Sequence, residues 1–190
     1  RLRPGASRRE PAAAVTGGTA VTEDAAFAVR LTVAETRACT GALVAPQWVL
    51  TARSCFAAAG GAVAAGPPVQ ETTATVGRPD LATTTGHQLQ VTQVVPHPDR
   101  NVALARLAVR VTDVVPVRVA TEPPVVGDDL RLLGYGRTET QWVPDRLQAA
   151  GFTVTAVDAT TLSIATDTGA TTCQGDAGGP ALHDDGDDAA

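Results

Sequence analysis

Short segments that alternate apolar and polar residues, separated by turn-forming residues, dominate this sequence. Residues 27–33 (Phe-Ala-Val-Arg-Leu-Thr-Val) alternate with a period of two, as expected of a strand that buries one face. Glycine, proline and aspartate mark turns roughly every 8–12 residues, a spacing typical of β-sandwiches and barrels. The sequence therefore predicts an all-β chain, with further strands at residues 40–44, 48–51, 69–76, 88–95, 102–107, 130–135, 151–156 and 161–164.

Composition narrows the class of protein. Aromatic residues make up only 3% of the chain, whereas valine, threonine and alanine are abundant, which favours strands. A chain of 190 residues is long enough for one core or for two small packed lobes. The net charge of -5 argues against a nucleic-acid partner. No apolar run approaches the ~20 residues of a membrane span, and no cofactor motif is present.

One glycine-rich stretch, Cys173–Pro180 (Cys-Gln-Gly-Asp-Ala-Gly-Gly-Pro), must form a tight loop. Three glycines in five positions let the backbone turn sharply and let another group approach closely. Asp176 lies in the middle of this loop, where burial is costly unless a positive group or several amides satisfy the carboxylate. We call residues 173–180 the central loop.

The central loop resembles the C-x-G-D-S-G-G-P loop of the trypsin/chymotrypsin-like serine proteases. The resemblance implies that the amides of Gly175 and Ala177 form an oxyanion hole, and that Ala177 stands where the family has its nucleophilic serine. Two more segments resemble the family. Ser54 replaces the histidine of its T-A-A-H-C motif, and Asn101 replaces the aspartate of its D-I-A-L motif.

These three replacements lead to the expectation that the chain is not an enzyme. A methyl group cannot attack a carbonyl, and a serine hydroxyl does not titrate near neutral pH as a general base must. Asp99 would share a strand face with Asn101, but the register of the following Ala-Leu favours Asn101. We therefore predict a degenerate triad, and we expect His87, His97 and His183 to be solvated or packed residues.

The resemblance also implies a fold of two packed Greek-key β-barrels, the second lacking its last strands. We expect a flexible arm over residues 1–14, a first lobe over 15–120, a second lobe over 121–183 and an acidic tail over 184–190. Val15 resembles the first residue of the mature protease, whose freed amino group pairs in that family with the residue equivalent to Asp176. Because Ala14 precedes Val15 here, that nitrogen is an uncharged amide.

The cysteines and the specificity pocket complete the comparison. Cys39 and Cys55 flank a strand-like segment and are expected to form a disulfide, which indicates an oxidising compartment and a secreted protein. Cys173 is either a free thiol or paired with a residue absent from this chain.

The resemblance places the floor of the specificity pocket at Thr171 and Thr172, which carry no charge. The acidic residues 184–188 lack the closing glutamate of a calcium loop, so no metal is expected.

Three functions remain open from the sequence. In the first, the domain is a binding and assembly module of a secreted bacterial complex, with a partner chain or peptide in the inter-lobe cleft and at the open sheet edge. Under this hypothesis, the chain resembles the trypsin-like domain of the lectin-bearing component of bacterial umbrella toxin particles. In the second, the chain is a serine endopeptidase, active through unidentified groups or inactivated by substitution. In the third, it is a structural fragment with no partner.

Overall fold

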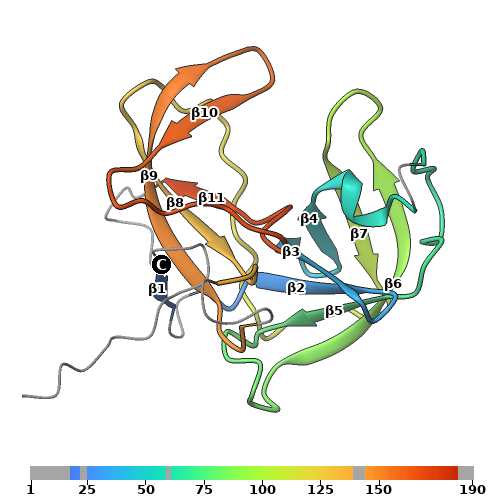
Figure 1. Cartoon of the computed structure of the whole chain (residues 1–190). Coiled ribbons are helices and arrows are strands. Elements are labelled where there is room, and N and C mark those ends of the chain that lie inside the picture. The colour runs from blue at the N-terminus through green and yellow to red at the C-terminus, as the bar shows by residue number, and fades with distance from the viewer. Residues whose placement is uncertain (1–17, 22–24, 59–60, 139–143, 184–190) are drawn as a thin grey trace, which may run out of the picture.

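The computed structural model describes residues 18–21, 25–58, 61–138 and 144–183. The predicted arm over residues 1–14, the expected start at Val15 and the acidic tail over 184–190 lie outside these residues. The described chain is all-β and contains almost no helix (Figure 1). Its one short named helix, η2 (Arg53–Phe56), follows the fourth strand directly.

The first half of the chain forms a closed six-stranded barrel, which lies at the right of Figure 1. All neighbouring strands are antiparallel. The barrel order β2-β3-β4-β7-β6-β5 leaves no free edge. Alternate residues point inward and form the core, as the period of two predicts. The strands are β2 (Ala28–Val33), β3 (Arg37–Ala45), β4 (Trp48–Thr51), β5 (Thr72–Val76), β6 (His87–Pro96) and β7 (Ala103–Leu107).

The second half forms an open five-stranded sheet, a half-barrel, at the left of Figure 1. The order is β1-β9-β8-β11, and β10 pairs with the far part of β9. Among the described residues this sheet does not close, so the fold class predicted from the sequence is confirmed. The two-residue strand β1 was not predicted, because it is too short to show a pattern. The strands are β1 (Thr19–Ala20), β8 (Asp129–Gly134), β9 (Gln148–Val157), β10 (Leu162–Ala165) and β11 (Ala181–His183).

A shared apolar cluster joins the barrel to the second sheet. Ala28 of β2 is fully buried and packs in the same cluster as Leu133 of β8 and Leu147, which precedes β9. Tyr135, only 1% exposed, donates its hydroxyl to the carbonyl oxygen of Arg78 at 3.1 Å. The two sheets are therefore held at a fixed junction. The lobe boundary predicted near residue 121 stays a prediction.

The β2–β3 hairpin turn stores backbone strain. Ala34 and Glu35, in the three-residue turn between Val33 and Arg37, have φ values of 50° and 58°, the left-handed region that residues with a Cβ rarely adopt. Asn tolerates this region better than alanine, so Ala34→Asn should raise the free energy of unfolding by about 0.5–1 kcal/mol in denaturant titrations. Ala108→Asn, outside this region, is the control and should show no gain. An Ala34→Asn variant no more stable than the native chain would contradict the prediction.

Candidate functional site

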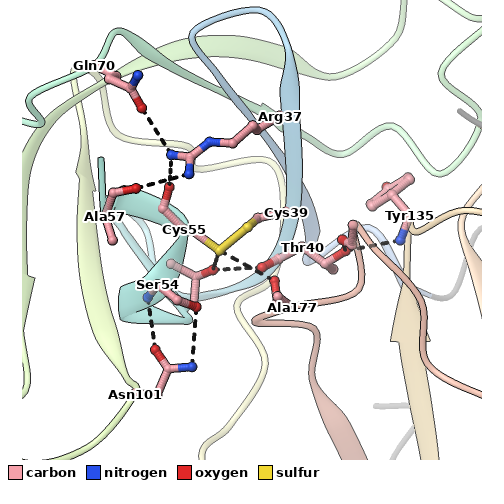
Figure 2. Close-up of a disulfide and its surroundings, with 12 residues drawn as sticks. Arg37, Cys39, Thr40, Ser54, Cys55, Ala57, Gln70, Asn101, Tyr135 and Ala177 are labelled. Carbon is pink, nitrogen blue, oxygen red and sulfur yellow. Dashed lines mark hydrogen bonds between the residues drawn. A yellow bond between two sulfur atoms is a disulfide. The ribbon is translucent and has the colours of Figure 1, made fainter. Parts of the chain in front are cut away.

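The central loop is anchored to the barrel by Thr40, the residue after Cys39 on β3. Thr40 is fully buried, and its N–H donates to the carbonyl oxygen of Ala177 at 3.0 Å. Its Oγ1 donates to the carbonyl oxygen of Gly175 at 2.8 Å and accepts from the N–H of Tyr135 at 3.0 Å. Figure 2 shows Thr40 between the loop and Tyr135. One side chain thus joins the barrel, the central loop and the end of β8.

Two glycines of the central loop are required by their surroundings. Gly178 has a φ of 86°, and a Cβ on it would overlap Thr51 Oγ1 and the carbonyl oxygen of Thr40. Gly175 has a φ of 106°, and a Cβ there would lie 2.7 Å from Gly136 Cα. A larger residue at 178 would force the loop away from the barrel, and a larger residue at 175 would force it away from Gly136, which follows β8. The glycine pattern in the sequence therefore reports a close backbone contact between the two halves of the molecule.

Asp176 points away from solvent toward the end of β8. It is 9% exposed. Its Oδ1 accepts from the N–H of Gly136 at 2.8 Å and its Oδ2 from the N–H of Cys173 at 2.8 Å. Gly134 and Gly136 leave room for the carboxylate, because a Cβ on either would overlap it. The predicted pairing of Asp176 with a freed amino group of Val15 lies outside the described residues.

Burial raises the pKa of Asp176 above its ordinary value, although the N–H donors of Cys173 and Gly136 act in the opposite direction. The folded chain therefore binds this proton more tightly than the unfolded chain. The resulting stabilisation is full below the unfolded pKa and is lost as pH rises through the raised pKa. We expect the stability of the native chain to fall over that interval relative to Asp176→Asn, which cannot titrate. Urea unfolding at a series of pH values measures the difference.

The exposed variant Asp167→Asn is the control for this titration and should track the native chain. A difference between Asp176→Asn and the native chain that stays constant with pH would show that the pKa of Asp176 is the same in the folded and unfolded chain, and would contradict the prediction.

The positions predicted for the base and its orienting residue lie side by side. The N–H of Ser54, on η2, donates to Asn101 Oδ1 at 2.8 Å. Asn101 Nδ2 donates to Ser54 Oγ at 3.3 Å, so the amide of Asn101 bonds both the backbone N–H and the hydroxyl of Ser54 (Figure 2). Asn101 lies on the β6–β7 loop, 47 residues further along the chain. The structure therefore brings together two residues that the sequence placed at corresponding family positions.

Ala177 lies across the disulfide from this pair. Its carbonyl oxygen is 3.7 Å from Cys55 Sγ, and Cys55 follows Ser54 directly (Figure 2). The Cys39–Cys55 disulfide is formed, as predicted. The N–H groups of Gly175 and Ala177 have no acceptor among the described residues. Unpaired N–H groups at these two positions are what an oxyanion hole requires, and of the two residues Ala177 is exposed whereas Gly175 is buried.

The remaining predicted residues contribute little to this site. Thr171 and Thr172 are exposed, and the thiol of Cys173 is half-buried and outside any disulfide. Two of the three histidines lie elsewhere: His87 pairs with Asp113 at 2.7 Å, and His183 with Asp128 at 3.2 Å. His97 shares the β6–β7 loop with Asn101, and its carbonyl oxygen accepts from the guanidinium of Arg53 at 3.1 Å. His97 Nδ1 accepts backbone N–H groups of its own loop.

The described part of the chain contains no cluster of three or more metal-ligating side chains. It also contains no helix long and apolar enough to cross a membrane.

Most of the chain, residues 14–189, matches the family model described as trypsin. The chain belongs to the trypsin family. The structure of neuropsin, a serine protease expressed in the limbic system of mouse brain, has the same fold, with a TM-score of 0.73 and 24% sequence identity. The alignment covers 88% of this chain and 82% of neuropsin. No curated protein matches the chain.

The family match corrects one prediction made from the sequence. We expected a chain that is not an enzyme, but membership of the trypsin family over residues 14–189 indicates a serine protease. The expectation was wrong because it extended the chemistry of three side chains to the whole domain. The assignment of Ser54, Asn101 and Ala177 to the triad positions, and the similarity to a toxin-particle component, stay predictions.

Sequence reasoning missed the residue that fixes the central loop. Thr40 is one of many threonines in the chain, and nothing in its local pattern distinguishes an anchoring threonine from an ordinary strand residue. Only its position opposite the central loop gives it this role, because Gly175 lies 135 residues further along the chain. The sequence also gave no sign that three arginines gather beside Gly175.

Proposed function

We propose that this trypsin-family domain is a serine endopeptidase-type domain that acts on a polypeptide segment lying across the central loop. The observation that supports the proposal is the pair of amides at Gly175 and Ala177. Their N–H groups are unbonded among the described residues, while Thr40 holds the carbonyl oxygens of both residues. Two fixed backbone donors stabilise the charge that develops on a carbonyl oxygen during hydrolysis.

Hydrolysis in this domain requires a nucleophile other than residue 177. Ala177 has no hydroxyl, and the Ser54 hydroxyl accepts from an amide rather than donating to a base. We propose that a water molecule adds to the carbonyl carbon and gives its proton to solvent while the two amides stabilise the oxyanion. The tetrahedral intermediate then breaks the bond to the ester oxygen or amide nitrogen, and this leaving group takes up a proton from solvent. In serine proteases of this type that lack a triad residue, measurements show roughly 10³–10⁴-fold residual acceleration over water. A slow activity of that order is expected here.

The test uses an activated ester of a short acetylated peptide, whose spontaneous hydrolysis is fast enough to measure. We expect the native chain to exceed buffer, and the bulky variant Ala177→Arg to return the rate to that of buffer. Ala108→Arg, an exposed position at the end of β7, should keep the native rate. Equal rates for the native chain and Ala177→Arg would reveal a contaminant or another site, and a native rate equal to buffer would refute the endopeptidase proposal.

A second role, docking of a partner chain, is favoured by a different observation. The concave face of the half-barrel carries a cavity of about 870 Å³. β8, β9 and the segment after β10 line it, with small apolar residues and threonines predominating. An open sheet beside such a cavity accepts an added strand. In this role the domain assembles a secreted bacterial complex, with a lectin domain on the same polypeptide.

Docking is tested by co-purification of the protein with its partner. Gly151 of β9 lines the cavity, is exposed and has open space where a Cβ would lie, so Gly151→Arg should abolish co-purification without disturbing the core. Val69, 82% exposed on the first half of the chain, provides the control Val69→Arg, which should retain the partner. Retention of the partner by Gly151→Arg would exclude this face as the docking surface.

A further inference from the structure

A smaller cavity of about 100 Å³ lies beside the central loop, between the β2–β3 hairpin and the end of the second sheet. This volume exceeds the roughly 10–15 Å³ that one water molecule needs. We call it the arginine pocket, because three guanidinium-bearing residues and only one carboxylate line it. The residues that define it are Arg30, Glu35, Arg37, Arg137, Gln174 and Gly175.

Arg30 supplies a half-buried positive charge that forms no direct ion pair with the described residues, although the carboxylate of Asp145 acts on it electrostatically. It lies on β2, opposite Thr40 in the β2–β3 register. Its guanidinium makes no hydrogen bond or ion pair with the described residues. Burial lowers the pKa of Arg30, although Tyr135 and Asp145 act in the opposite direction. A guanidinium that has lost part of its hydration is strongly stabilised by a bound anion.

Arg37 is fixed in position but not neutralised. Its guanidinium donates to the carbonyl oxygens of Ala57 and Cys55 and to Gln70 Oε1, each at 3.0 Å (Figure 2). All three acceptors are neutral, so these bonds do not cancel the charge of Arg37, and they direct its guanidinium toward Cys55, Ala57 and Gln70. The backbone N–H of Arg137 donates to the carbonyl oxygen of Gln174 at 2.8 Å, which ties a third arginine to the central loop.

The charge of the pocket contrasts with that of the chain. The whole sequence carries a net charge of -5, whereas the pocket lining has three arginines against Glu35. Glu35 is held there by the strained hairpin turn, with a φ of 58°. An arrangement of this kind selects small anions, and guanidinium groups pair best with planar carboxylates or with phosphates.

We propose that the arginine pocket binds a side-chain or terminal carboxylate of the polypeptide that lies across the central loop. Gly175 connects the two sites, since it belongs to the amide pair and also lines the pocket. A segment whose carbonyl reaches those amides therefore places a neighbouring residue at the pocket. The inference rests on the proposed function and assigns acidic polypeptides as its preferred substrates or ligands.

The test titrates the protein with acetyl-triglutamate amide, acetyl-triglutamine amide and inorganic phosphate at equal ionic strength. Binding is followed through the NMR signals of the arginine Nε–H groups. We expect triglutamate to saturate the Arg30 signal and triglutamine to leave it unchanged. Loss of one charge-assisted contact in Arg30→Gln should weaken triglutamate binding by about tenfold or more. Removal of the opposing charge in Glu35→Gln should strengthen binding several-fold.

Arg110→Gln is the matched control, because Arg110 is exposed and distant from the pocket lining. It should bind triglutamate as the native chain does. Equal binding of triglutamine, binding of phosphate alone, or an unchanged affinity in Arg30→Gln would each overturn the assignment.

The same experiments separate this inference from the proposed function. Triglutamate binding at Arg30 without any ester hydrolysis would support the carboxylate site and contradict the endopeptidase proposal. Hydrolysis of neutral and acidic peptide esters at equal rates, unaffected by Arg30→Gln, would support the endopeptidase proposal and contradict the carboxylate site.

Discussion

The triple variant Ser54→His, Asn101→Asp, Ala177→Ser should hydrolyse the peptide ester at least about 10³-fold faster than the native chain. The substitutions install a base, its orienting carboxylate and a nucleophile at the three clustered positions. In serine proteases, measured losses on removing this machinery reach about 10⁶ in kcat, so a partial gain of this size is a modest expectation.

The local geometry supports this gain. Residues 54 and 101 already exchange two hydrogen bonds, at 2.8 and 3.3 Å. An aspartate at 101 would accept the Nδ1 proton of a histidine at 54 and hold its other nitrogen ready for a serine at 177. The anchor at Thr40 and the free amides of the central loop stay unchanged in the variant.

The single variant Ala177→Ser is the control for cooperation, because it adds a hydroxyl without a base. Its rate should stay within about tenfold of the native rate, since the effects of triad members are strongly non-additive. Circular dichroism establishes that each variant is folded. A folded triple variant with the native rate would show that the three positions are not arranged as a triad.

Removal of the Cys39–Cys55 disulfide by alanine substitution at both positions should lower the free energy of unfolding by about 3 kcal/mol. The bond closes a loop with a sequence separation of 16 residues, and chain-entropy estimates for such loops are ~3 kcal/mol. Both cysteines are also buried in the barrel core, at 8% and 3% exposure. Guanidinium unfolding of the native and double-alanine proteins measures the loss.

Cys173→Ala is the matched control, because Cys173 is half-buried and lies outside the disulfide. It should cost about 1 kcal/mol or less. We also expect the double-alanine protein to lose the ester hydrolysis of the native chain before it unfolds, because Cys55 lies on η2 and its sulfur is 3.7 Å from the carbonyl oxygen of Ala177. A double-alanine protein with unchanged stability would contradict the structural role of the bond.

Local pattern was enough to predict most strands. The predicted segment at residues 48–51 matches β4, and the segment at 27–33 differs from β2 by one residue. Strand ends were less accurate: the segment predicted at 69–76 begins three residues early, since β5 starts at Thr72. Alternation reports which residues face a core, but hydrogen bonding to a neighbour decides where pairing ends.

The sequence by itself determined the all-β class, the Cys39–Cys55 pair and the glycine-rich central loop, because each depends on residue type at a short spacing. Only the tertiary structure decided what those parts do together. Thr40 meets Gly175 across 135 positions, and Arg30, Arg37 and Arg137 line one cavity although they come from three separate segments. Such contacts depend on how the two sheets pack, and no local spacing encodes the position of a residue relative to a distant loop.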